Sequence, residues 1–230
     1  MFSKLDLCWG FHQIELDEES RQITMFVTHR GLYRYKRLTS DITSAPEKYQ
    51  KIVSDVLQGC EGDANIADDV IVHGCGIELH AKNLLAVLDQ TVWTNPECKK
   101  VPVQTPKLTF FGHDLSKNAV APSEEKVAAV QSAKPPKNVA EVRSFLGLVQ
   151  YCAKFLPNFA QEGEPIRRLT KKDEPFIWEE AQQQSFEKLK HLLTRAETLA
   201  YFKNGCKTCI VADAGPTGNG EVLTQLQDGA

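Results

Sequence analysis

Residues 65–73 read Asn-Ile-Ala-Asp-Asp-Val-Ile-Val-His, two short β arms that meet at a pair of aspartates. The arms, Asn65–Ala67 and Val70–Val72, are rich in apolar and β-branched residues, which favours strands. The pattern predicts a β-hairpin with Asp68 and Asp69 at its tip. Taken alone the pair is weak evidence of function, because aspartate is common in turns.

A second acidic strand lies near the start of the chain. Residues 4–7, Lys-Leu-Asp-Leu, predict a short strand that carries Asp6 and runs into a turn marked by Gly10. In residues 23–38, apolar and polar side chains alternate on both sides of Arg30-Gly31, which predicts a β-hairpin. The second arm of this hairpin is strongly basic. That arm suits a nucleic-acid contact and fits a solvated face about as well.

The remaining elements are predicted mainly from helical periodicity. Ser44 to Glu47 reads as a capping box for a helix that continues to Gly59, and Asn138 with Glu141 as a second box. Further helices are predicted at 78–92, 123–133 and 179–193, with strands at 108–115 and 208–214 and an irregular stretch at 91–106. The strand at 108–115 is expected to join the same small sheet as the first 90 residues.

Composition limits the class of protein. Lys and Arg number 27 against 30 Asp and Glu, so a polynucleotide site must be local. Seven cysteines, an odd number at irregular spacings, favour a reducing compartment over a secreted disulfide framework. No apolar stretch approaches the roughly 18 residues that span a bilayer. We therefore expect an intracellular protein, cytoplasmic or nuclear and not secreted, with no membrane partner.

Carboxylates on rigid strands suit divalent-metal chemistry. Nucleotidyl transfer uses two Mg²⁺ ions about 3.5–4 Å apart that clamp the attacking hydroxyl and the leaving pyrophosphate. Mg²⁺ prefers oxygen ligands, and two or three aspartates suffice when nucleotide phosphates supply the rest. Asp6, Asp68 and Asp69 match this requirement. We predict that they are catalytic and bind Mg²⁺, with Mn²⁺ as an alternative.

The chain resembles reverse transcriptases of gypsy-class LTR retrotransposons over nearly its whole length. Residues 2–7, Phe-Ser-Lys-Leu-Asp-Leu, with Gly-Phe-His-Gln at 10–13, resemble the first palm motif, and residues 66–69 resemble the aspartate-pair hairpin. Residues 108–113 are similar to the primer-grip hairpin and residues 141–148 to the helical connection signature. The resemblance implies that Asp6 and Asp68 bind the metal and that Asp69 assists.

The resemblance also implies a nucleotide site. Phe11 takes the position of the aromatic steric gate, which excludes a ribose 2′-hydroxyl; the alternative is an ordinary core phenylalanine. Ser40 and Asp41 fall beside the incoming nucleotide, where the family usually has an apolar or Gln side chain followed by glycine. Asp41 adds a Cβ and a negative charge there, so nucleotide binding should suffer.

The implied fold is α+β. A reverse transcriptase palm, a small antiparallel sheet with helices and without fingers, would occupy 1–116, and thumb or connection helices 117–200. The truncated start of a ribonuclease H-like domain, a strand pair carrying Asp213, would occupy 201–230. As a fragment of an RNA-directed DNA polymerase, the chain would take an RNA or DNA template-primer and dNTPs. We expect it to be inactive in isolation, without ribonuclease H activity, and to self-associate through exposed edges.

Other interpretations stay open. The chain can be a non-catalytic, degenerate retroelement remnant with weak nucleic-acid binding, or an unrelated domain with accidental aspartates. Cys206 and Cys209 have metal-like spacing without a second pair. The basic residues Arg167, Arg168, Lys171 and Lys172 suit a phosphate backbone, but a solvated helix end explains them better.

Overall fold

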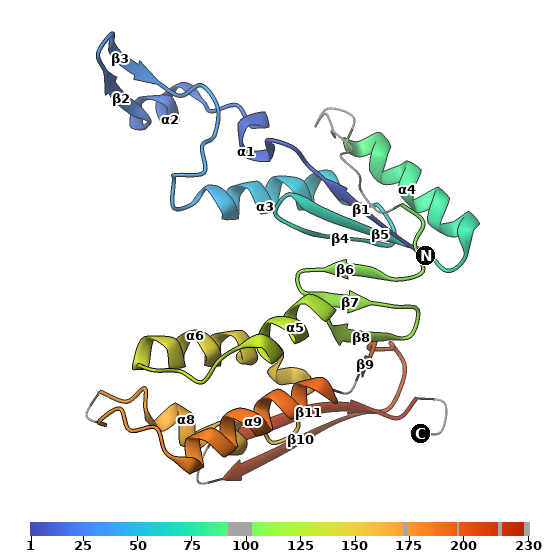
Figure 1. Cartoon of the computed structure of the whole chain (residues 1–230). Coiled ribbons are helices and arrows are strands. Elements are labelled where there is room, and N and C mark those ends of the chain that lie inside the picture. The colour runs from blue at the N-terminus through green and yellow to red at the C-terminus, as the bar shows by residue number, and fades with distance from the viewer. Residues whose placement is uncertain (92–102, 173, 197, 216–217, 228–230) are drawn as a thin grey trace. The chain divides into compact units, whose positions relative to one another are not determined.

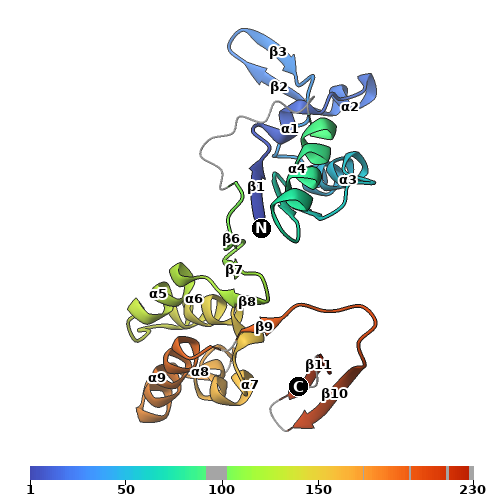
Figure 2. The same ribbon diagram turned by 90° about the vertical axis from the view of Figure 1, so that its right-hand side faces the viewer.

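The computed structural model describes residues 1–91, 103–172, 174–196, 198–215 and 218–227. They fall into two compact units, Met1–Leu108 and Thr109–Ala230. Figures 1 and 2 show the elements of each unit from two directions. The irregular stretch predicted at 91–106 lies mostly outside the described residues.

A three-stranded antiparallel sheet in the order β1-β5-β4 is the centre of the first unit (Figure 1). Its strands are β1 (Phe2–Asp6), β4 (Asp63–Ile66) and β5 (Asp69–His73). Helices α3 (Ala45–Val56) and α4 (Ile77–Thr91) share one core with the sheet. That core consists of Leu5, Leu7, Tyr49, Val53, Leu57, Val70, Val72 and Val87. The predicted hairpin and both predicted helices are therefore confirmed.

The segment between β1 and α3 contains two short helices and a separate ribbon. The helices are α1 (Gly10–Gln13) and α2 (Glu18–Ile23), and the ribbon pairs β2 (Met25–Thr28) with β3 (Gly31–Arg34). The hairpin predicted around Arg30-Gly31 is confirmed. An ion pair of 2.7 Å between Arg34 and Glu18 ties the ribbon to α2.

The second unit contains a different sheet, in the order β6-β7-β8-β9. Its strands are β6 (Leu108–Phe110), β7 (His113–Leu115), β8 (Ala119–Pro122) and β9 (Leu199–Ala200). The hairpin that the resemblance implied at 108–113 agrees with the adjacent strands β6 and β7, but the continuous strand predicted at 108–115 and its place in the first sheet are wrong. A turn at Phe111 and Gly112, both with positive φ, divides it into two strands, and neither joins the sheet of β1. The Tyr151 hydroxyl donates a hydrogen bond to the Phe111 carbonyl, which holds this turn.

Helices form the rest of the second core. They are α5 (Glu124–Ser132), α6 (Val139–Gln150), the 3₁₀ helix η2 (Ala153–Phe155), α7 (Phe159–Glu162), α8 (Glu164–Arg168) and α9 (Glu180–Thr194). Phe186 of α9 is fully buried and its ring centroid lies 4.6 Å from that of Phe145 of α6. The predicted helical region beyond residue 123 is confirmed. No helix in the described ranges is both long and apolar enough to cross a membrane.

The two predicted capping boxes differ in the structure. The Asn138 side chain accepts a hydrogen bond of 2.9 Å from the Glu141 backbone amide, as predicted for a helix N-terminus. Glu141 in turn accepts from the amide of Lys137, one residue earlier than a capping box requires. Ser44 makes no side-chain capping bond, so the first box is wrong. Its backbone is already in the helical region, where the hydroxyl is not aimed at the free amides.

The chain ends in a ribbon of two long strands, β10 (Thr208–Gly215) and β11 (Gly218–Gln225). The apolar side chains of Ile210, Val211, Val222 and Leu223 are all more than half exposed. Exposed apolar ribbons of this kind favour pairing with other chains, and self-association stays a prediction. The backbone of Asp213 lies in β10, and its side chain is outside the described part of the chain.

Candidate active site

The pairing of β1 with β5 brings two of the predicted carboxylates together. Asp6 lies directly opposite Asp69 in the antiparallel register, and Lys4 lies opposite Ile71. Directly opposed residues project from the same face of a sheet, as do residues two apart on one strand. Lys4, Asp6 and Asp69 therefore share the face opposite to the one on which Leu5 and Val70 pack against the helices.

Asp68 occupies the turn between β4 and β5. The Leu7 amide donates a hydrogen bond of 2.8 Å to the Asp68 carbonyl, which fixes the turn against the end of β1. Ala67 takes a positive φ of 50°, an uncommon conformation for a residue with a Cβ. The Gln50 carboxamide of α3 accepts from the Ala67 amide at 2.7 Å and donates to the Asn65 carbonyl at 3.2 Å. A polar side chain of the helix thus holds the strained turn.

The Asp68 side chain meets Gly10 and Tyr49. A Cβ built on Gly10 would lie closer than 3.0 Å to both the Tyr49 hydroxyl and Asp68 Oδ1, so only glycine fits between them. The Tyr49 ring belongs to the core, with 3% of the residue exposed. Its hydroxyl and Asp68 Oδ1 both border the space beside Gly10. Asp68 is consequently held from the interior side of the sheet.

Burial raises the pKa of the Asp68 carboxyl above its usual range. The Tyr49 hydrogen bond opposes this rise in pKa, and the negative charges of Asp6 and Asp69 add to it. Burial and the Asp68 charge likewise raise the pKa of Tyr49, so the phenol stays protonated. Asp68 Oδ1 is buried and has no hydrogen-bond partner among the described residues. A buried carboxylate oxygen without a donor is chemically suited to a cation.

Lys4 engages the third carboxylate. Its ammonium lies 2.8 Å from Asp69 Oδ1, and both side chains are about a quarter exposed. Within the described ranges, no three His, Cys, Asp or Glu side chains come together closely enough to hold a metal ion. The unpartnered Oδ1 of Asp68 suits a cation, and Asp6 is near enough for its charge to raise the Asp68 pKa, whereas Asp69 is paired with a lysine.

The raised pKa of Asp68 predicts how stability depends on pH. The folded chain binds the Asp68 proton more tightly than the unfolded chain does, so the charged form lowers stability above the folded pKa. This penalty disappears as pH falls below the unfolded pKa. Asp68→Asn should therefore raise the free energy of unfolding at neutral pH, and the gain should vanish in acid. Urea unfolding of the wild-type chain and of Asp68→Asn at neutral and at acid pH, with a chelator present, measures the gain in stability and its loss.

Asp55→Asn is the control for this prediction, because Asp55 is an exposed aspartate of α3 that pairs with Lys51 at 3.3 Å. It should change stability by less than about 0.5 kcal/mol at either pH. A stability gain from Asp68→Asn that persists unchanged in acid would contradict the assigned pKa shift.

Known proteins resemble this chain over most of its length. It is 36% identical over 234 residues to the "Retrovirus-related Pol polyprotein from transposon 412" of Drosophila melanogaster, a match that covers 99% of this chain and 19% of the relative. It is 29% identical over 232 residues to the "Transposon Tf2-3 polyprotein" of Schizosaccharomyces pombe, covering 99% of this chain and 17% of the relative. The chain is homologous to transposon Pol polyproteins. It spans about a fifth of the length of these curated relatives.

Part of this Pol-like chain matches a defined family. The family described as "RNase H-like domain found in reverse transcriptase" matches residues 178–230, which include α9 and the β10–β11 ribbon.

Solved structures show the same fold. A foamy viral protease-reverse transcriptase in complex with double-stranded DNA has a TM-score of 0.87 and 22% identity, covering 97% of this chain and 40% of that one. The same kind of viral protein in complex with an RNA/DNA hybrid has a TM-score of 0.85 and 21% identity, covering 97% and 33%. The mixed α and β fold expected from the sequence is confirmed at this level.

The predicted nucleotide-site residues lie in two segments of the Pol-like chain. Phe11 is half-buried, and its ring centroid lies 4.9 Å from that of Tyr49, the partner of Asp68. Ser40 and Asp41 are exposed, on the loop before α3. The Leu38 amide donates to the Ile14 carbonyl at 2.9 Å and ties this loop to the end of α1. In the described residues, no hydrogen bond or ion pair joins Ser40 or Asp41 to the three aspartates. Their nucleotide role stays a prediction.

The other candidate sites receive less support. Cys206 and Cys209 are free thiols, and no third ligand of the His, Cys, Asp or Glu type joins them within the described residues. Arg167 pairs with Glu164 at 2.8 Å and Arg168 pairs with Glu174 at 3.3 Å. These ion pairs favour a solvated helix end over a phosphate-binding patch.

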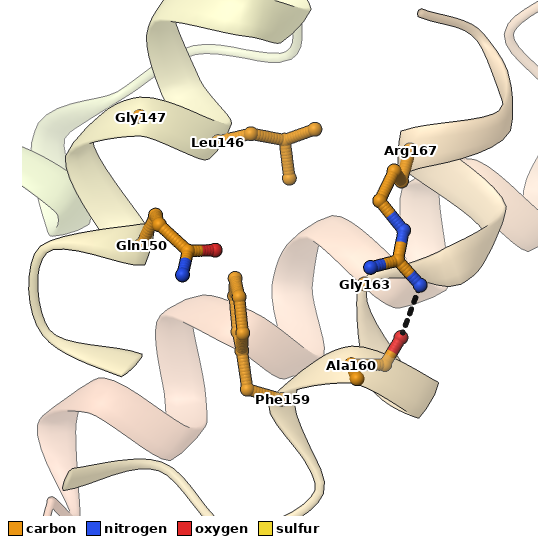
Figure 3. A pocket seen from close by; sticks show the side chains of 7 residues that line it. All are labelled: Leu146, Gly147, Gln150, Phe159, Ala160, Gly163 and Arg167. Atoms are coloured by element: carbon orange, nitrogen blue, oxygen red, sulfur yellow. Dashed lines mark hydrogen bonds between the residues drawn. The ribbon is translucent and has the colours of Figure 1, made fainter. Parts of the chain in front are cut away.

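A pocket of about 200 Å³ lies in the second unit, where α6, α7 and α8 meet (Figure 3). Leu146 and Phe159 form apolar walls, and the Arg167 guanidinium is bonded to the Ala160 carbonyl at 3.3 Å. No carboxylate, cysteine or histidine lines this pocket. This pocket therefore offers no carboxylate, thiol or imidazole for acid–base or metal chemistry.

Proposed function

We propose that this chain is the nucleotidyl-transfer segment of a gypsy-class RNA-directed DNA polymerase. Asp6 and Asp68 hold a divalent cation, Mg²⁺ or Mn²⁺, and Asp69 assists. The observation that carries the proposal is the position of Asp68: its buried Oδ1 has no hydrogen-bond partner within the described residues, and it lies at the turn where the strand bearing Asp6 ends. Homology to transposon Pol polyproteins over 99% of the chain supports it.

Each protein group has a physical task in this proposal. When bound, the cation supplies charge stabilisation at the transferring phosphoryl group. Asp6 and Asp68 bind and orient it from two connected backbone segments. Tyr49 remains a protonated donor that fixes the Asp68 rotamer, and Gly10 leaves the space that this contact needs. Phe11, packed on Tyr49, excludes a ribose 2′-hydroxyl by its bulk.

The proposed partners are an RNA or DNA template-primer and dNTPs. The foamy viral proteins that share the fold were solved with double-stranded DNA and with an RNA/DNA hybrid. In this chain, the arm from Arg30 to Arg37 carries four exposed cations, of which Arg34 pairs with Glu18, and no acidic residue. A local basic segment on a chain of net charge -3 is the element best suited to a phosphate backbone.

A second candidate function is a non-catalytic segment that binds nucleic acid weakly. Asp41 favours it, because an exposed carboxylate stands where the reverse transcriptase pattern has glycine beside the nucleotide phosphates. Template-directed extension of a primed RNA by the chain with Mg²⁺ and dNTPs, abolished by Asp68→Asn, supports the polymerase. Because the isolated chain is expected to be inactive, cation binding separates the two candidates when no extension is seen.

Cation binding tests the proposal directly. Free Mn²⁺ is measured by electron paramagnetic resonance as the chain is titrated, and Mg²⁺ is then added as a competitor. The chain should bind Mn²⁺, and Asp68→Asn should weaken binding at least about tenfold, the range seen when metal sites lose a supporting group. Asp55→Asn, which removes an exposed carboxylate from α3, should leave the affinity unchanged. Equal affinity in Asp68→Asn and the wild-type chain would overturn the proposed cation site.

A further inference from the structure

We propose that Lys4 is an internal counter-cation that withholds Asp69 from the metal site, so that the first divalent cation is taken by Asp6 and Asp68 alone. This inference rests on the proposed function and assigns a positioning role to a residue of β1. The juxtaposition that carries it is an ion pair of 2.8 Å on the same sheet face as Asp6.

The sheet register explains why a lysine is needed there. Asp6 and Asp69 are direct cross-strand partners, and like charges in that position repel. Lys4 is two residues before Asp6 on the same strand, so its side chain reaches Asp69 diagonally across the two strands. The Lys4 ammonium thus neutralises the carboxylate that would otherwise face Asp6 uncompensated.

The same contact competes with a metal ion. A divalent cation bound to Asp69 must displace the ammonium or lie beside it, and both arrangements place like charges at short range. The side chains of Lys4 and Asp69 are only 28% and 24% exposed, so solvent screens the pair incompletely. Competition of this kind agrees with the absence, in the described ranges, of a three-carboxylate group able to hold a metal. Asp68 forms no ion pair with Lys4 among the described contacts, and its buried Oδ1 has no hydrogen-bond partner there.

The experiment compares Mn²⁺ affinity in Lys4 variants. Lys4→Gln should raise the affinity roughly tenfold, because it removes one competing charge near the site. Lys4→Met, which keeps the aliphatic stem, should give the same gain, and Lys4→Arg, which keeps the charge, should restore wild-type affinity. Lys51→Gln is the matched control, since Lys51 forms an exposed ion pair with Asp55 on α3 and should have no effect. Circular dichroism of each variant checks that it is folded.

Repeating the comparison in the Asp69→Asn background distinguishes the release of Asp69 as a metal ligand from a general effect of removing a positive charge. If Lys4 acts by holding Asp69, the gain from Lys4→Gln should shrink to at most about twofold when Asp69→Asn is already present. An equal gain in both backgrounds overturns the inference, as does unchanged or weaker binding in Lys4→Gln. If Asp68→Asn weakens binding but Lys4→Gln changes nothing, this inference alone fails. If Asp68→Asn binds as the wild-type chain does, the proposed function fails as well.

Discussion

Gly10→Ala is expected to destabilise the first unit by about 1–3 kcal/mol, the usual cost of forcing an extra methyl group into a packed site. The new Cβ would come within 3.0 Å of the Tyr49 hydroxyl and of Asp68 Oδ1. Tyr49 is packed in the core, so relieving the clash must displace its ring, the Asp68 side chain or the backbone of α1. Faster amide hydrogen exchange in α3 and β5, together with weaker Mn²⁺ binding, would be the measured result.

Gly147→Ala is the matched control, because Gly147 is also a helical glycine and a Cβ there meets nothing within 4 Å. It should leave Mn²⁺ binding unchanged and stabilise α6 by up to about 1 kcal/mol, since glycine inside a helix is unfavourable. Wild-type exchange rates and Mn²⁺ affinity in Gly10→Ala would show that the Gly10, Tyr49 and Asp68 contact is looser than described.

Phe186→Ala should destabilise the second unit by about 3–5 kcal/mol, the range for removing a buried phenylalanine. Phe186 is 0% exposed, and its ring lies 4.6 Å from that of Phe145 and 6.0 Å from that of Trp178. The truncation leaves a cavity between α6 and α9. Urea unfolding followed by hydrogen exchange should show the loss in α6 and α9.

Phe202→Ala serves as the comparison, because Phe202 is in the same unit and is 59% exposed. Its expected effect is below about 0.5 kcal/mol. Similar losses from the two substitutions would mean that the rings around Phe186 do not form the core of this unit.

Elements with a clear periodic pattern could be predicted from the sequence, since periodicity depends only on which residues face the core. The hairpin around Asp68, the helix after Ser44 and the long helix that carries Phe186 are of this kind. The turn at Phe111 could not be predicted in this way. It depends on positive φ values and on a hydrogen bond from Tyr151, 40 residues away along the chain.

The sequence predicted the acidic residues of the candidate site but not the groups around them. The order of the motifs indicated Asp6, Asp68 and Asp69, whereas no motif indicated the residues that contact them. Tyr49 has the helical spacing of a core residue, and only packing shows that its hydroxyl reaches Asp68. Lys4 meets Asp69 because of the exact strand register, and residue types alone do not fix a register.

The direct opposition of Asp6 and Asp69 also has a consequence for how the sheet assembles. If β1 slipped by one residue against β5, Asp6 would turn to the side where Leu5, 3% exposed, now fills the apolar layer. Burying a carboxylate among Val70 and Val72 is strongly unfavourable, and Leu5 would be left in water. The acidic side chains thus help to set the strand register. A sheet with β1 shifted by one residue is unfavourable, and such a sheet would lack the candidate site.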